Sequence, residues 1–333
     1  MQPVRELTGI DPRALPDELL LSPEPVLLRG LVAHWPATQA GARSGAAAVA
    51  YLRSCWRDAT VGFLLGPPEI DGRFFYNDDL SGFNFSREVG AFNQVLDALM
   101  QMASEAQPQA LYVGSTTVDT CLPGFRADND LGFGARDPLV SVWLGNRSRI
   151  AAHFDLPDNL ACVVAGHRRF TLFPPDEVAN LYVGPLDFTP AGQAVSLVDF
   201  SRPDFSRFPR FAQAMQQARV IDLGPGDALF IPSLWWHHVE ALDPFNLLVN
   251  YWWRQSPEHM DSPMGALMLA LMTVRDLPPA QRQAWQGLFA HYVFGADEDT
   301  AAHVPPAARR ALAPIDANSA RRLRAELLKR LNR

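Results

Sequence analysis

The sequence predicts a mainly β protein with helical flanks, and three observations lead to this prediction. Short β-rich runs bounded by turn residues fill the middle of the chain, from residue 109 to residue 254. Helical patterns precede and follow this region. The 28 prolines and 22 glycines would interrupt long helices and suit short strands joined by turns. The expected core is therefore an antiparallel barrel or sandwich.

Residues 1–108 are expected to form an α/β cap on this core. A strand is predicted at 25–30, and an alanine-rich helical stretch follows at 46–53. Further along, apolar residues recur at helical spacing after Ser86, a residue type that favours the helix N-cap. This pattern predicts an amphipathic helix over 87–105.

The region 109–254 supplies the strands of the core. Gly224-Pro225-Gly226-Asp227 is typical of a tight turn before a strand, and the turn at Gly166 predicts a hairpin. The predicted strands are 109–113, 139–144, 160–165, 170–173, 219–223, 228–231 and 246–253.

Residues 255–333 are predicted to form a helical tail. Its helices are expected at 263–276, at 279–292 and from about Ser319 to the end of the chain. In the last helix Leu323, Leu327 and Leu331 share one face. That face needs a cover, which packing within the chain or a second copy of it in a homodimer could supply.

Composition and charge exclude several classes of protein. With 29 Lys and Arg against 36 Asp and Glu, the formal net charge is −7, so a nucleic-acid partner is not expected. The three cysteines, Cys55, Cys121 and Cys162, are too scattered for a disulfide framework or a structural zinc site. The longest apolar run, 264–272, is about half of a membrane span, and no targeting segment is evident at the N-terminus. A cytoplasmic protein without membrane contact is therefore expected.

Two separated motifs contain candidate metal ligands. His153 and Asp155 are two residues apart, so on an extended segment both side chains point to one face. His237 follows the strand predicted at 228–231, between tryptophans and a second histidine. Two histidines and one carboxylate form a facial triad that leaves coordination positions open on Fe(II), whereas a closed zinc site would need a fourth ligand. The alternative for His237 is a core histidine bonded to a backbone carbonyl.

Further motifs accompany this triad from about Trp143 to Trp253. They are His153-Phe154-Asp155 with Asn159, Gly166 to Pro175, Val198 to Phe200, Gly224 to Asp227, Trp236 to Val239 and Val249 to Trp252. In order and spacing they resemble the JmjC, cupin-like hydroxylases, in particular the branch with the asparaginyl hydroxylase of hypoxia-inducible factor and bacterial cupin-like proteins. The resemblance implies a double-stranded β-helix (cupin or jelly-roll) over 109–254. It also implies an oxygenase that uses Fe(II), 2-oxoglutarate and dioxygen, with His153, Asp155 and His237 as iron ligands.

The resemblance also assigns cosubstrate residues. Tyr112 matches the tyrosine that meets the distal carboxylate of 2-oxoglutarate, and Asn159 and Asn250 match asparagines that line the cosubstrate pocket. Where the family usually has a lysine paired with that carboxylate, this chain has Arg168, which keeps the charge and offers a bidentate fork. Where the family often has Thr or Ser three positions before the first ligand, this chain has Ile150.

The expected function is hydroxylation of a protein side chain or a small metabolite, so the partner is a peptide or a small molecule. One alternative is a redox-inert metal-binding cupin that binds or isomerises a small polar ligand such as a sugar; another is a catalytically silent dimeric scaffold. The substrate pocket is expected to be built by the N-terminal cap, the loop at 123–134 and the insert at 186–211. Five tryptophans are candidates either for its walls or for the hydrophobic core: Trp143, Trp235, Trp236, Trp252 and Trp253.

Overall fold

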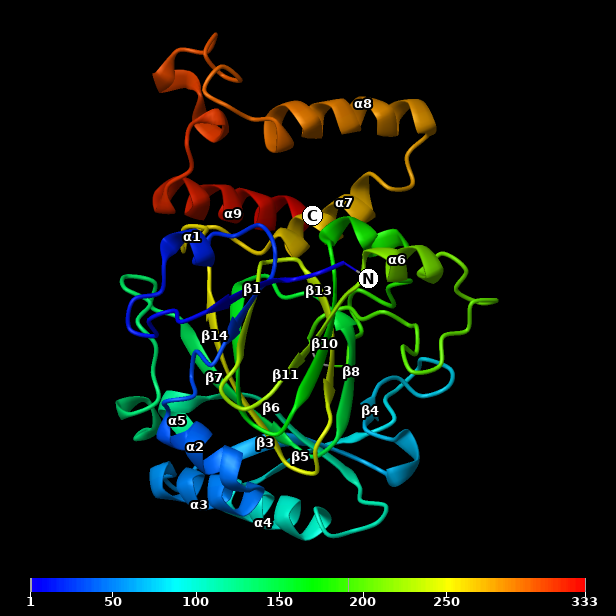
Figure 1. Ribbon diagram of the computed structural model, residues 1–333. Helices are drawn as coiled ribbons and strands as arrows, with labels where there is room; N and C mark the ends of the chain where they lie inside the picture. Colours follow the sequence, from blue (N-terminus) through cyan, green and yellow to red (C-terminus); the bar gives the residue numbers. More distant parts are fainter. Residues whose placement is uncertain (1, 191, 333) are drawn as a thin grey trace. The chain divides into compact units, whose positions relative to one another are not determined.

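The computed structural model describes residues 2–190 and 192–332. The chain divides into two compact units, Met1–Arg254 and Gln255–Arg333. The first unit contains two β-sheets that face each other, with helices outside them, and the second unit is helical (Figure 1).

Strands β7 to β14 form a double-stranded β-helix, as predicted. In the larger sheet the neighbours are β12, β9, β14 and β7, and in the smaller sheet they are β11, β10, β13 and β8. The chain therefore crosses between the sheets at almost every turn, and the pairs within each sheet are antiparallel. The strands are β7 Leu139–Gly145, β8 Ser148–His153, β9 Asp158–Ala165, β10 Arg168–Phe173, β11 Arg219–Leu223, β12 Ala228–Ile231, β13 Trp236–Ala241 and β14 Asn246–Trp253.

The hairpin predicted at Gly166 is wrong, although the turn is present. Strand β9 pairs with β12 and β14, whereas β10 pairs with β11 and β13 in the other sheet. Gly166 has φ +72°, and a Cβ there would collide with Asn246. A glycine is thus required for the chain to cross tightly from one sheet to the other.

Segments before residue 118 extend both sheets. Over the described residues the larger sheet has nine strands and the smaller has five. The added strands of the larger sheet are β1 Arg5–Thr8, β2 Val26–Arg29, β3 Thr60–Gly66, β5 Ser86–Ala91 and β6 Ala110–Thr117, and β4 Arg73–Phe74 joins β8 in the smaller sheet. Of these six added strands, only β2 and the start of β6 were predicted from the sequence.

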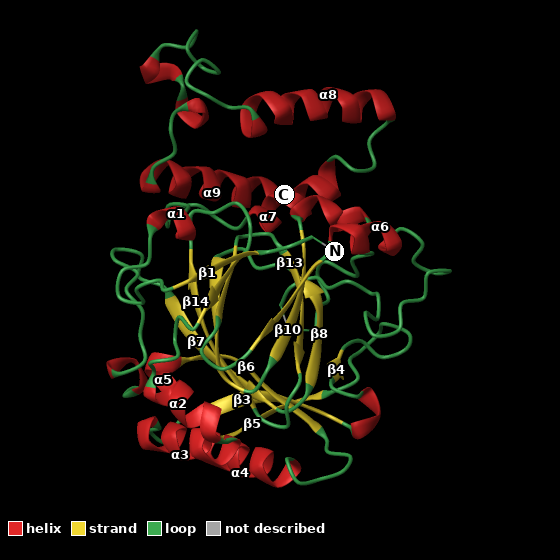
Figure 2. Cartoon of the chain, viewed as in Figure 1, coloured by secondary structure: helices red, strands yellow, loops and turns green. Residues whose placement is uncertain are grey.

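Helices cover the outer face of the larger sheet (Figure 2). Trp35, Leu96 and Phe125 are fully buried there against sheet residues such as Val249. The described α-helices of the first unit are α1 Asp17–Leu20, α2 Pro36–Arg43, α3 Gly45–Cys55, α4 Phe92–Met102, α5 Val118–Cys121 and α6 Phe211–Gln217.

The helix predicted over 87–105 begins later than expected. Residues 86–91 form β5, and the N-cap of α4 is Ala91 rather than Ser86. Val89 pairs with Gly62 of β3 and its side chain is 77% exposed. Its apolar character therefore does not mark the buried stripe of a helix. Pairing with a strand distant in sequence overrides the local helical pattern.

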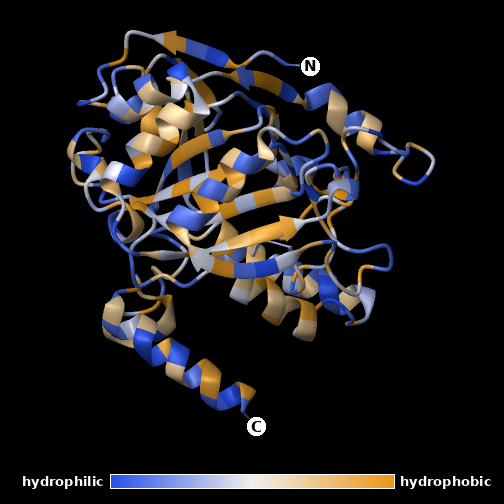
Figure 3. Ribbon diagram, turned by 90° about the horizontal axis from the view of Figure 1, so that it is seen from below, coloured by the Kyte–Doolittle hydropathy of each residue, from blue (hydrophilic) through white to orange (hydrophobic). Residues whose placement is uncertain are grey.

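The second unit contains the three predicted helices, α7 Pro263–Thr273, α8 Pro279–Phe289 and α9 Ala317–Leu331. Asp316 caps α9 and forms a capping box with Ser319. Among the described residues, none in these helices is buried, and α9 alternates between apolar and polar residues (Figure 3). No described helix is both long and apolar enough to cross a bilayer.

Candidate metal and cosubstrate site

The three predicted metal ligands, His153, Asp155 and His237, lie close together at one end of β8 and β13. One ligand atom from each lies within 4.8 Å of the others. Nε2 of His237 is 3.7 Å from Oδ2 of Asp155, and the centroids of the two imidazole rings are 4.3 Å apart. Two imidazoles and a carboxylate are the donor set of a facial triad.

A β-bulge in β8 aligns the two histidines. His237 lies opposite His153, and Val239 lies opposite Ile150, so two residues of β8 oppose one residue of β13. In a regular strand, residues three apart point to opposite faces. Because of the bulge, both Ile150 and His153 line the same cavity.

Hydrogen bonds orient both imidazoles toward the common point. Nδ1 of His153 is 2.9 Å from the carbonyl oxygen of Ala151, and Nδ1 of His237 is 3.0 Å from that of Trp235. Donation from Nδ1–H to these carbonyls leaves Nε2 of each ring as the lone-pair donor for a metal. Burial, with the nearby His153, lowers the pKa of His237, which favours the neutral form that a metal requires.

The carboxylate of Asp155 is held by a chain of polar side chains. Trp252 Nε1 and Asn159 Nδ2 donate to its Oδ2 at 3.2 and 3.3 Å. Asn250 Nδ2 donates to Asn159 Oδ1 at 3.3 Å, and Trp143 Nε1 donates to Asn250 Oδ1 at 2.8 Å. Asn159 and Asn250 both line the cavity of the triad and also support a candidate metal ligand, a role that was not predicted from the sequence.

The triad lies in a cavity of about 260 Å³ between the inner faces of the two sheets. Most of its walls are apolar or aromatic. They are formed by Tyr112, Ser115, Trp143, Ile150, Asn159, Ala161, Arg168, Phe170, Gln193, Val239, Leu248, Asn250 and Trp252, together with the triad. A cavity of this kind shields charges from water and strengthens their interactions.

Arg168 is the only arginine or lysine among the described residues that line this cavity. Its side chain is buried, and its Nε has no hydrogen-bond partner among the described residues. Burial lowers the pKa of its guanidinium and raises the pKa of the neighbouring Tyr112 to about 12. Within the described residues the Arg168 guanidinium thus has no ion-pair partner, and the Tyr112 hydroxyl beside it remains protonated at neutral pH.

Several expectations about the cavity walls need correction. The loop at 123–134 contributes no described lining residue, because Phe125 and Phe133 pack in the core on the outer face of the larger sheet. Trp143 and Trp252 are walls, whereas Trp235, Trp236 and Trp253 are buried in other clusters.

Two polar lining residues were not singled out from the sequence. Gln193 comes from the insert expected at 186–211, so only its region was anticipated. Ser115 is exposed, has φ +23° and lies where the pairing of β6 with β7 shifts register. Gly114, directly before it, is the local signal that could have indicated such a break, since glycine inside a strand often marks a bulge.

The comparisons with known proteins agree with this fold and site. The cupin-like domain family matches residues 12–259, so the chain belongs to this family. Similar proteins include Lysine-specific demethylase JMJ31 of Arabidopsis thaliana, 36% identical over 37% of this chain and 23% of that protein. Lysine-specific demethylase 8 of Xenopus tropicalis is 28% identical over 71% of this chain and 49% of that protein. The tRNA wybutosine-synthesizing protein 5 of Danio rerio is 35% identical over 38% of this chain and 33% of that protein. The chain thus spans less than half of the length of each.

We predict that Trp252→Phe weakens metal binding about tenfold to a hundredfold, because supporting hydrogen bonds to a ligand contribute this much to metal affinity. The substitution removes the indole N–H that donates to Asp155. Titration calorimetry with Mn(II) measures the change. Trp253→Phe is the matched control, since the indole nitrogen of Trp253 has no hydrogen-bond partner among the described residues. Equal Mn(II) affinities for the two variants would contradict the prediction.

Proposed function

We propose that the protein is an Fe(II)- and 2-oxoglutarate-dependent oxygenase that hydroxylates its substrate. The observation that carries the proposal is the buried guanidinium of Arg168, whose Nε has no hydrogen-bond partner among the described residues, in the same cavity as the triad of His153, Asp155 and His237. Membership of the cupin-like family, with relatives named as demethylases, supports it.

The residues of the cavity fit both Fe(II) and 2-oxoglutarate. Nε2 of His153 and of His237 and the carboxylate of Asp155 would hold Fe(II). Arg168 and the hydroxyl of Tyr112 would bind the distal carboxylate of 2-oxoglutarate, because a buried dicarboxylate needs a cation and donors. When bound, iron and 2-oxoglutarate supply the activation of dioxygen, with 2-oxoglutarate converted to succinate and CO2.

The chain's own residues contribute orientation and shielding. Asn159 and Trp252 hold the Asp155 carboxylate in one orientation. The side chains of Phe170, Val239 and Leu248 line the cavity with apolar surface, which limits the access of water. Ile150 offers no hydrogen bond where the family often has one, so the cosubstrate would depend more strongly on Arg168.

The substrate is proposed to be a protein side chain or a small metabolite. The names of the relatives refer to lysine in some cases and to tRNA in another, so they do not point to one substrate. The polar side chains of Ser115 and Gln193 line the cavity that contains the triad. They are the groups available to contact a substrate there.

The decisive experiment is turnover of 2-oxoglutarate. The protein is loaded anaerobically with Fe(II), mixed with 2-oxoglutarate and exposed to air, and succinate is measured. Succinate is expected from the wild type and not from His153→Ala. If metal binds but 2-oxoglutarate neither binds nor reacts, the redox-inert metal-binding cupin is favoured. If neither binds, the silent scaffold is favoured.

We predict that Arg168→Met weakens 2-oxoglutarate binding at least about a hundredfold, because it removes one partner of a buried charge pair. Calorimetry on the Mn(II)-loaded protein measures the dissociation constant. Arg169→Ala is the matched control, since Arg169 is exposed and pairs with Asp222 on the outer face of the sheet. An unchanged dissociation constant in Arg168→Met would show that Arg168 does not bind 2-oxoglutarate.

We also propose that the chain forms a homodimer through its helices in 255–333. Large apolar side chains of this unit are exposed, including Met272 at 68% and Phe294 at 84%, as are Leu327 and Leu331 on one face of α9. Soluble monomers rarely expose so many large apolar residues in one region, and a symmetric partner would cover them.

The dimer proposal predicts that replacing Leu327 and Leu331 together by Glu yields a monomer. Charges on an apolar contact surface would have to be buried without partners. Sedimentation velocity measures the mass of the wild type and the variant. Arg322→Glu, at an exposed position of the same helix, serves as the control and is expected to remain dimeric. A monomeric wild type would contradict the proposal.

A further inference from the structure

The middle of the insert, residues 192–201, begins at the cavity and runs along β8 from the His153 end toward Arg149. Gln193 lines the cavity of the triad, and Gln193, Val195 and His153 also line a smaller pocket beside it. The backbone N–H of Ser196 donates to the carbonyl oxygen of Ala152 at 2.8 Å, directly before His153. This segment is therefore attached to the strand that supplies the first candidate iron ligand.

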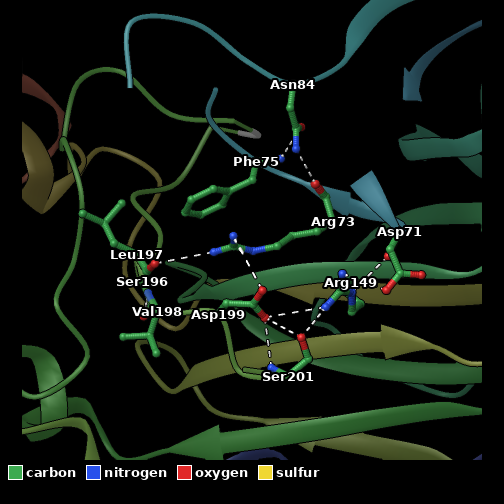
Figure 4. Close-up of polar contacts among 10 residues, drawn as sticks. All are labelled: Asp71, Arg73, Phe75, Asn84, Arg149, Ser196, Leu197, Val198, Asp199 and Ser201. Atoms are coloured by element: carbon green, nitrogen blue, oxygen red, sulfur yellow. Dashed lines mark hydrogen bonds and ion pairs between the residues drawn. The ribbon is translucent and has the colours of Figure 1, made fainter. Parts of the chain in front are cut away.

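Asp199 links this segment to β4 and β8 (Figure 4). Its Oδ2 lies 3.9 Å from Nη1 of Arg73, and its Oδ1 lies 3.6 Å from Nη1 of Arg149. Arg73 also donates to the carbonyl oxygen of Leu197 at 3.5 Å and stacks on Phe75 at 3.8 Å. The carboxylate of Asp199 thus connects the insert to an arginine of β4 and to an arginine of β8.

This cluster is shielded from solvent. The exposed fractions of the side chains are 22% for Asp199, 22% for Arg73 and 15% for Arg149. Although burial opposes it, hydrogen bonds from Ser201 and the charges of both arginines hold the pKa of Asp199 below its usual range. Ion pairs in such surroundings are screened less than those on an open surface.

Asp204 provides an internal comparison. It accepts hydrogen bonds from the backbone N–H and the hydroxyl of Ser206, at 3.0 and 2.6 Å. Asp199 makes the same local turn with Ser201, at 3.0 and 2.7 Å. Asp204, however, is exposed, and its further contact is the backbone N–H of Arg207 at 3.1 Å; no arginine side chain in the described part of the chain forms an ion pair with it. The two aspartates therefore share a turn and differ in the bridge to neighbouring strands.

We infer that Asp199 is a positioning residue of the candidate active site. Its bridge to Arg73 and Arg149 holds residues 192–199 against β8, so that Gln193 faces the end of the cavity that contains His153. The role at a substrate rests on the proposed function, whereas the bridge itself can be tested without it.

Hydrogen exchange measured by mass spectrometry on the metal-free full chain tests this inference. Asp199→Asn is expected to raise the exchange of the Gly184, Ser196 and Leu197 amides about tenfold, because loss of an anchoring interaction promotes local opening. These amides make backbone hydrogen bonds of 2.8 to 3.0 Å. The amides of β13 and β14 are expected to exchange as in the wild type.

Three further variants make the test specific. Asp199→Glu keeps the charge and is expected to restore most of the protection. Asp204→Asn removes the same charge from the same kind of turn and is expected to leave the three amides unchanged. Arg73→Gln retains the pair with Arg149, so a smaller increase at the same amides is expected, and it replaces Asp199→Asn if that variant fails to fold.

Two outcomes would overturn the inference. One is unchanged exchange at the three amides in Asp199→Asn. The other is an equal increase throughout β8, β10 and β13, which would make Asp199 a general stabilising residue. Mn(II) and 2-oxoglutarate dissociation constants within about twofold of the wild type are expected, since a change of that size is well under 1 kcal/mol. Because exchange is measured without metal or turnover, failure of this inference is distinguishable from failure of the oxygenase proposal.

Discussion

The candidate site depends on the antiparallel pairing of β8 with β13. His153 ends the first strand, His237 is the second residue of the other, and the register places them opposite each other. The bulge in β8 then turns both Ile150 and His153 toward the cavity. A register shift of one residue would move one histidine to the outer face. The place of Asp155, just after β8, follows from the same pairing.

The second constraint is the charge of Arg168. It is buried between two sheets, with an Nε that no described residue satisfies, and a buried guanidinium without an anion is costly. Strand β10 pairs with β11 on one side and β13 on the other, and this pairing holds Arg168 in its buried position despite the cost in free energy. In the proposed function, the isolation that makes the cation costly in the free protein would also strengthen its interaction with a bound carboxylate.

Patterns along the chain predicted six of the eight strands of the double-stranded β-helix, because their apolar residues are buried, but not β8 and β13, which carry the two histidines of the triad. The runs at 139–144, 228–231 and 246–253 match β7, β12 and β14 closely. The outer strands escaped prediction because their side chains are exposed and carry no clear alternation; β5 is exposed over its first four residues. Pairing with a neighbour, rather than local sequence, stabilises such strands.

The sequence by itself determined the family, the residue types of the triad and the helices of the tail, since these depend on motifs and on short-range periodicity. Only the tertiary structure decided that β9 and β10 enter different sheets, that Phe125 and Phe133 pack away from the cavity, and that Asp199 bridges Arg73 and Arg149. The physical reason is that sheet assignment, register and ion pairing depend on contacts between residues far apart in the chain. Local hydrophobic patterns do not encode those partners.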